Sequence, residues 1–88
     1  MKSKLTIDQY GTKRWRLPNG NLHREDGPAC EYSGGGKWWY LNGQLHREDG
    51  PACEYTNGYK AWWLNGIEYT EQEYKLKIRS RKLKLLLH

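Results

Sequence analysis

Short apolar segments alternate with turn-forming residues along most of the chain, and the whole pattern recurs at a fixed spacing. The eleven residues LHREDGPACEY occupy positions 22–32 and return unchanged at 45–55, a shift of 23 residues. Asn-Gly pairs recur with the same shift, at 19–20, 42–43 and 65–66. Recurrence at such a period is typical of stacked supersecondary units. The pattern predicts three copies of one unit, at about residues 1–20, 21–43 and 44–66.

Each copy has the pattern of a β-hairpin. In the third copy, PACEY is followed by the turn residues TNGY and then by KAWWLNG, which is rich in residues that favour strands. In the middle copy the turn is Ser33-Gly34-Gly35-Gly36, where a positive φ costs little. The connection QLHREDGP then joins one hairpin to the next. We therefore expect a mostly β fold, a single-layer meander of three repeated hairpins.

The segment after residue 66 departs from the repeat and has the signals of a helix start. Thr70-Glu71-Gln72-Glu73 fits a capping box, and its acids suit the positive end of a helix dipole. The alternative for this segment is a strand, because YKLKIRS alternates apolar and polar residues. The capping box and the run of Lys, Leu and Arg favour a basic C-terminal α-helix at about 71–86. With 88 residues, the whole chain 1–88 is expected to be a single domain.

The repeat resembles the MORN-type repeats, in the divergent form "HREDGPA…NG…K.WW.NG" of tailed-phage and giant-virus proteins. The resemblance covers residues 5–66 and is strongest over 20–66. It implies a single-layer meander of hairpins with a regular twist. Such repeats serve as scaffolds that bind proteins, lipids or nucleic acids. The phage connection implies a host-directed role, for example inhibition of a bacterial defence factor or a ribonuclease toxin.

The reactive-looking residues recur with the repeat, which favours a structural role. A metal site is the alternative for the polar side chains of the HRED segments, but adjacent residues seldom converge on one ion as spaced ligands do. These side chains are His23, Glu25, Asp26, His46, Glu48 and Asp49. We expect no metal, no cofactor and no catalytic residue; a Cys-His nucleophile, repeated in two copies, is the enzymatic alternative.

The two cysteines, Cys30 and Cys53, hold equivalent places in successive hairpins. Two strand spacings put them roughly 9–10 Å apart, beyond disulfide range, so they should be reduced. A shift of 23 residues places Ile7 in the same position of the first copy. The same shift aligns acids and bases on either side of each hairpin turn, which predicts cross-hairpin ion pairs. The pairs are Asp8–Arg14, Glu31–Lys37 and Glu54–Lys60.

The aromatic residues predict a binding surface. There are five Trp, seven Tyr and no Phe, and alternation along the strands places aromatic rings on both faces of the sheet. One face is expected to hold Trp15, Leu17, Trp38, Tyr40 and Trp63, and the other Trp39, Leu41, Trp62 and Leu64. One helix can cover only one face, and an exposed apolar patch usually has a partner. The predicted partner-binding residues are Trp15, Trp38, Tyr40 and Trp63.

Positive charge is concentrated in the C-terminal segment. It holds six basic residues and no acid, whereas the preceding 74 residues hold nine basic and ten acidic residues. The expected nucleic-acid-binding residues are Lys75, Lys77, Arg79, Arg81, Lys82 and Lys84. On a helical wheel the apolar residues form two opposed stripes with bases between them, one of Tyr74, Ile78 and Leu85 and one of Leu76, Leu83 and Leu87.

These features together predict a small non-enzymatic binding protein in the cytoplasm. The first hypothesis is binding of RNA, or of an RNA–protein complex, through phosphate contacts of the helix and stacking on exposed rings. The alternative is a protein–protein inhibitor or adaptor that binds a bacterial host protein through the aromatic sheet face. Binding to a membrane surface is a less favoured hypothesis, because the basic residues occupy two opposed helix faces. The apolar surface that remains exposed favours a homodimer.

Overall fold

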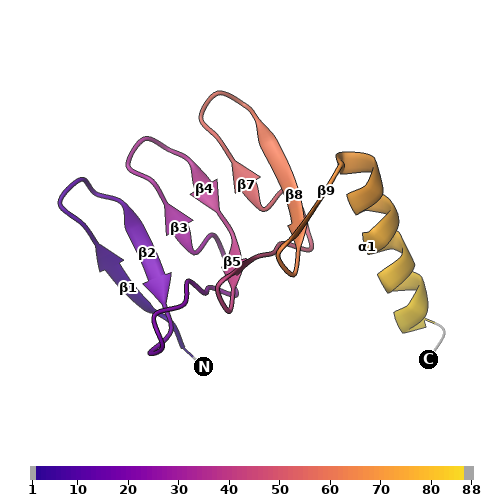
Figure 1. Cartoon of the computed structure of the whole chain (residues 1–88), viewed down its shortest axis with the longest axis horizontal. Helices are drawn as coiled ribbons and strands as arrows, with labels where there is room; N and C mark the ends of the chain where they lie inside the picture. Colours follow the sequence, from indigo (N-terminus) through magenta and orange to yellow (C-terminus); the bar gives the residue numbers. More distant parts are fainter. Residues whose placement is uncertain (1, 87–88) are drawn as a thin grey trace.

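A computed structural model describes residues 2–86 and shows a row of antiparallel hairpins followed by one helix (Figure 1). The strands of the main sheet lie in the order β1, β2, β3, β4, β7, β8, β9. Their bounds are Lys4–Ile7, Lys13–Arg16, Cys30–Glu31, Lys37–Trp38, Cys53–Glu54, Lys60–Leu64 and Ile67–Tyr69. The shortest dimension of the molecule is 17 Å. The mostly β, single-layer meander of hairpins is therefore confirmed, as is the helix, α1, at Glu71–Leu86.

A second series of short hairpins joins the end of a predicted hairpin to the segment that follows it. The first half of β8 pairs with β7, and its second half pairs with β9 through an Asn65-Gly66 turn. In the middle copy β5 (Tyr40–Leu41) pairs with β6 (Gln44–Leu45) through an Asn42-Gly43 turn. Both turns have φ of 51° at Asn and 80° at Gly, as a type I′ hairpin requires. The strand β8 therefore pairs with the preceding strand over its first half and with the following strand over its second half.

In the first copy, the residues before the turn at 17–21 are offset by one residue from the 23-residue alignment with the other two copies. Arg14 and Trp38 both stand opposite Cys30, so Arg14 is the structural equivalent of Trp38. The 23-residue shift had instead aligned Trp15 with Trp38. The cause lies in the turn at residues 17–21, where the Leu17 N–H donates to the Asn21 carbonyl across three residues, whereas Leu41 pairs with Gln44 across two. Pro18-Asn19-Gly20 thus makes the first copy one residue longer.

This slip corrects the assignment of Ile7. The sequence alignment placed Ile7 in the buried position of Cys30, but Ile7 is 58% exposed whereas Cys30 is 1% exposed. Thr6 takes that position, because it stands opposite Arg14. The side chain of Ile7 therefore lies on the other face of the sheet, at its outer edge.

The helix begins as the capping box predicts. The Thr70 hydroxyl accepts a hydrogen bond from the Glu73 N–H at 3.1 Å, and the Glu73 carboxylate accepts one from the Thr70 N–H at 2.9 Å. Among helix residues 71–84, whose burial the structure describes, Tyr74 is buried. Its hydroxyl accepts from the Gly50 N–H at 3.3 Å and donates to the Arg47 carbonyl. The helix therefore docks on the last copy, against β8 and β9, and does not lie across a sheet face (Figure 1).

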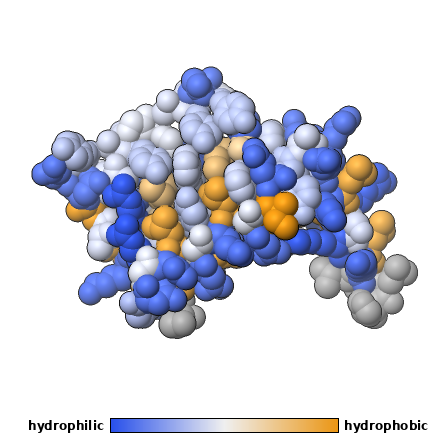
Figure 2. Space-filling view, viewed as in Figure 1, coloured by the Kyte–Doolittle hydropathy of each residue, from blue (hydrophilic) through white to orange (hydrophobic). Residues whose placement is uncertain are grey.

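The two apolar stripes of the helix have different surroundings. Tyr74 and Ile78 point toward the sheet, whereas Leu76 and Leu83 are 65% and 54% exposed. Figure 2 shows hydrophobic residues at the surface of the helix among hydrophilic ones. The side chain of Leu85 and the whole of Leu87 lie outside the described residues. Within residues 2–86, no helix is long and apolar enough to cross a membrane.

We expect Tyr74→Phe to loosen the helix from the sheet. The change removes the hydroxyl that satisfies both the Gly50 N–H and the Arg47 carbonyl, at an expected cost of about 1–2 kcal/mol in free energy of unfolding. Urea denaturation followed by circular dichroism measures this cost. The control is Tyr10→Phe, because Tyr10 is 73% exposed. Equal stability of the two variants would contradict the docking role of Tyr74.

Candidate functional site

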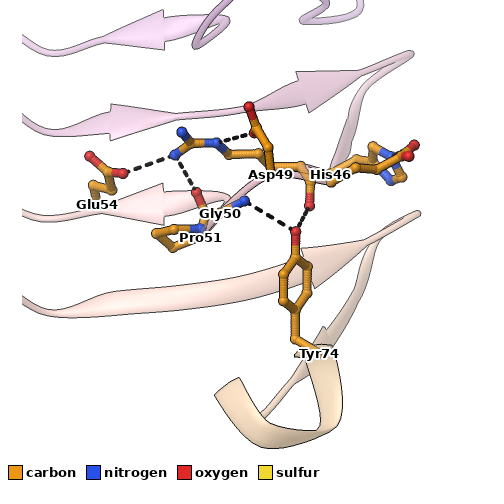
Figure 3. A network of polar contacts seen from close by, with 8 residues as sticks. His46, Asp49, Gly50, Pro51, Glu54 and Tyr74 are labelled. Carbon is orange, nitrogen blue, oxygen red and sulfur yellow. Dashed lines mark hydrogen bonds and ion pairs between the residues drawn. The ribbon is translucent and has the colours of Figure 1, made fainter. Parts of the chain in front are cut away.

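The arginine of each HRED segment is the centre of a polar network within the repeat. The Arg47 guanidinium donates to the carboxylates of Asp49 at 2.8 Å and Glu54 at 2.9 Å, and to the Pro51 carbonyl at 3.0 Å (Figure 3). It also stacks 3.8 Å above the centre of the Trp39 ring. These contacts use the fork of donors that only arginine offers.

The preceding copy repeats this network with little change. Arg24 donates to Asp26 at 2.9 Å, to the Pro28 carbonyl at 3.2 Å and to Glu31 at 3.1 Å. It stacks 3.9 Å above the centre of the Trp15 ring. The duplicated geometry supports the structural role that was predicted for these charged residues.

The two histidines connect each copy to the next. Nδ1 of His23 accepts a hydrogen bond from the Asn42 N–H, and Nδ1 of His46 accepts one from the Asn65 N–H, both at 2.9 Å. Both rings are buried, and Nε2 of His46 lies 2.9 Å from Glu48. Each histidine therefore holds the type I′ turn of the following copy. Across residues 2–86, no group of three or more His, Cys, Asp or Glu side chains is placed to hold a metal ion.

The ion pairs across the hairpins differ from the prediction in two of three cases. Asp8 and Arg14 pair at 3.0 Å, and this hydrogen bond lowers the pKa of the Asp8 carboxyl. Glu31 and Glu54, however, pair with the HRED arginines rather than with the lysines opposite them in the sheet. No ion pair among the described residues involves those lysines, Lys37 and Lys60. The carboxylates pair with the arginines rather than the lysines because each guanidinium also bonds a carbonyl and a second carboxylate.

The two cysteines are buried on one face of the sheet. Cys30 and Cys53 are free thiols, as predicted, and lie on either side of Trp38, which stands opposite both. They are 1% and 2% exposed. Burial, with a contribution from the charge of Glu68, raises the pKa of the Cys53 thiol to about 11. Because the thiolate is the reactive species, burial and the raised pKa both disfavour reaction of Cys53 in the folded chain.

Aromatic side chains gather on one face of the sheet around Trp38. The Trp38 ring lies 5.7 Å from Tyr32 and 5.8 Å from Tyr55 in edge-to-face geometry, and 6.4 Å from Tyr40 in a stacked arrangement. Tyr55 lies 5.3 Å from Tyr59. We call these five residues the aromatic face. Its rim is accessible, since Tyr32, Tyr55 and Tyr59 are 38%, 39% and 58% exposed.

The predicted partner-binding residues divide between the two faces of the sheet. Trp38 and Tyr40 belong to the aromatic face, and Trp63 shares that side because Ala61, two residues earlier, stands opposite Cys53. Trp15 lies on the other side, under Arg24, so its predicted placement beside Trp38 was wrong. The three tyrosines of the rim were missed, because they flank the hairpin turns and alternation was followed only within the strands.

The six predicted cationic residues all lie on α1, but their surroundings differ. Lys75 pairs with Glu71 at 3.2 Å, and Lys77 lies 5.9 Å from the centre of the Tyr69 ring. Arg81 and Lys82 line a cleft of about 730 Å³ between the helix and the HRED loops, and Arg79 and Lys84 are exposed. Among described residues, no carboxylate lies within ion-pair distance of Lys77, Arg79, Arg81 or Lys82.

The cleft is lined by charged and apolar residues. The two HRED loops contribute four acids together with Arg24 and Arg47, and the helix contributes Arg81 and Lys82. Trp39, Leu41 and Ile78 contribute apolar surface. The acids that line it are Glu25, Asp26, Glu48 and Asp49. The cleft therefore carries both signs of charge.

No protein-family model, curated protein or solved structure matches the chain. The resemblance to MORN-type repeats stays a prediction. The aromatic face and the cations of α1 are the two surfaces from which a function can be proposed.

We expect Cys53 to be unreactive in the folded protein. A Cys30→Ser variant isolates this thiol, and its reaction with a disulfide reagent at pH 8 should be far slower than in urea, because burial raises the Cys53 pKa to about 11. Absorbance of the released thiol measures the rate. A folded-state rate close to that in urea would show that the thiol is accessible and ionised, and would reopen the Cys-His alternative.

Proposed function

We propose that the protein is a non-enzymatic, cytoplasmic binding protein for RNA, in single-stranded form or within an RNA–protein complex. The observation that carries this proposal is the distribution of partnered and unpartnered charge. On the sheet, the carboxylates of Asp8, Glu31 and Glu54 are each engaged by an arginine. On α1, Lys77, Arg79, Arg81 and Lys82 have no such partner among the described residues. Lys37 and Lys60 of the sheet are also without an ion pair, but they stand opposite Glu31 and Glu54. The helix has no acid after residue 74, so it concentrates positive potential that an anionic polymer can neutralise.

The aromatic face supplies the second element that a single strand needs. Unpaired bases stack on Trp and Tyr rings with little dependence on sequence. Tyr32, Tyr55 and Tyr59 present exposed rings around Trp38, and the alternating hairpins hold these rings at fixed positions. A strand that stacks here and reaches α1 would gain both stacking and phosphate contacts. Duplex RNA offers no free base faces, so the proposal is specific to unpaired segments.

Catalysis has little support, because most of the polar side chains that resemble catalytic groups form hydrogen bonds or ion pairs within the protein. The HRED arginines and histidines, with Asp26, Glu48 and Asp49, are each bonded within the repeat or to the next copy. The arginine contacts and the bond from histidine to the following asparagine occur twice, in equivalent positions. A catalytic site needs a convergent set of groups directed at a substrate.

The second candidate function is inhibition of a protein through the aromatic face. Exposed Tyr rings around a half-buried Trp have the composition of an interface hot spot. The basic helix would then steer the protein toward an acidic target. A host-directed inhibitor of a ribonuclease toxin or another defence factor fits this candidate. The two candidates differ in whether purified RNA alone is bound, which the following measurements decide.

We expect replacement of Lys77, Arg81 and Lys84 by Gln to weaken binding to a single-stranded RNA and to flatten its salt dependence. Each lost phosphate contact should reduce the slope of log K against log salt by about 0.7, and three contacts by about 2. Fluorescence anisotropy at several salt concentrations measures the slope.

The matched control removes the same charge from the sheet, by replacing Lys13, Lys37 and Lys60 with Gln. These lysines lie in one row across the sheet. The control should lose less affinity and less slope than the helix variant. Equal losses in both variants would mean that net charge, not the helix, determines binding. An absence of RNA binding by the unmodified protein at low salt would favour the protein inhibitor.

We expect the double change Tyr32→Ala and Tyr55→Ala to weaken RNA binding by a different route. It removes two rings of the aromatic face, so affinity for a single strand should fall while the salt slope stays unchanged. Tyr10→Ala is the control, because Tyr10 is 73% exposed and outside the aromatic face. An unchanged affinity in a folded double variant would exclude the aromatic face as the stacking surface.

A further inference from the structure

The outer edge of β1 carries backbone groups that no described strand uses. Trp15 donates its N–H to the Ala29 carbonyl and accepts a bond from the His23 N–H, both at 2.9 Å, so its backbone groups point away from β1. Leu5 stands opposite Trp15 and is therefore in a pair without hydrogen bonds. Its N–H and C=O point outward, and those of Ile7, two residues on, have the same direction. No described strand pairs with this edge.

The side chains of this edge are also exposed. All four residues of β1 are solvent-exposed, with Leu5 at 42% and Ile7 at 58%. Natural sheets usually protect an edge with proline, a bulge or several charged residues. In β1 Lys4 is the charged residue, and there is no proline. The edge thus combines unpaired backbone groups with apolar side chains, which are the features of a surface that adds a strand.

We propose that β1 pairs with β1 of a second copy of this chain, antiparallel, about a two-fold axis at Thr6. In this register Leu5 stands opposite Ile7 of the second copy, and the reverse. All outward N–H and C=O groups of Leu5 and Ile7 in each copy then meet a partner in the other. The inference concerns assembly, and it is independent of the ligand proposed above.

The side chains favour this register over its neighbours. It places apolar opposite apolar for Leu5 and Ile7. It also places Lys4 opposite Asp8 of the second copy, whose carboxylate already pairs with Arg14 of its own copy. Opposite charges and apolar pairs at facing positions both stabilise a strand pair. A shift by two residues in either direction sets Ile7 opposite Ser3, or Leu5 opposite Gln9. A shift by one residue leaves the outward backbone groups without partners.

The two-fold register also brings the two Thr6 residues face to face. They form a pair without hydrogen bonds, in which Cα atoms approach to about 4.5 Å. This distance lies at the lower end of the range that a disulfide spans. Because β1 and α1 lie at opposite ends of the meander (Figure 1), pairing would yield one continuous sheet with a basic helix at each far end.

The first experiment measures self-association by sedimentation equilibrium over a range of concentrations. The unmodified protein should form a dimer, and Ile7→Lys should be monomeric. The matched control is Ile67→Lys on β9, because Ile67 has the same 58% exposure as Ile7. This control should dimerise as the unmodified protein does. A monomeric unmodified protein at its highest soluble concentration, or dimerisation of Ile7→Lys equal to that of the unmodified protein, would overturn the proposal.

The second experiment tests the register even if Ile7→Lys fails to fold. Thr6→Cys should form a disulfide-linked dimer rapidly under mild oxidation, whereas Thr56→Cys, in an exposed turn, should remain monomeric. The native Cys30 and Cys53 are buried and should not interfere. A protein that self-associates while Thr6→Cys gives no cross-link would show that the copies meet elsewhere, and the proposed pairing would be wrong.

Discussion

The contact on which the repeat depends is that of one arginine with its Trp ring, two carboxylates and a carbonyl. A one-layer sheet has no second layer against which to bury a core. Arg47 compensates by holding the HRED loop against the sheet, with Trp39 beneath it and Glu54 beside it. Ala52, which follows the loop, is 0% exposed. A lysine in this position would keep the charge but lose the planar stacking and the directed bonds.

Adjacent copies are joined by a different contact. The buried histidine of one copy accepts the N–H of the asparagine that opens the next type I′ turn. The arginine thus holds the loop of its own copy, and the histidine holds the turn of the next copy, beside the strand pairing that also joins the copies. This division of roles explains why His and Arg are neighbours in the sequence but contact different partners. It also accounts for a segment that resembles catalytic chemistry and is instead structural.

The repeat and the helix could be predicted because each depends on local sequence. A fixed period identifies stacked units without knowledge of their contacts, and the capping box of Thr70 and Glu73 marks a helix start by itself. The slip of the first copy could not be predicted from the period. It depends on whether Pro18 belongs to a strand or to a longer turn, and the pairing of β2 with both neighbours decides this. One inserted residue then moves Trp15 to the opposite face.

The candidate surfaces were predicted in part, for similar reasons. The basic residues of α1 follow directly from composition, but which of them lack a carboxylate depends on how the helix docks through Tyr74. Trp38 and Tyr40 were found from alternation, whereas Tyr32 and Tyr55 join them only because successive hairpins bring their turns alongside one strand. The choice of Arg24 over Lys37 by Glu31 needs the folded position of the HRED loop, which no spacing rule describes.

The exact duplication of residues 22–32 at 45–55 has a consequence for how such a chain can change in length. Because the His23–Asn42 and His46–Asn65 junctions have the same geometry, gain or loss of one 23-residue segment in the gene would create no new type of junction. The helix is attached to the last copy alone, through Gly50 and Arg47, and would move with it. Duplication alone can thus change the distance between the first hairpin and the positively charged helix, in steps of one 23-residue copy.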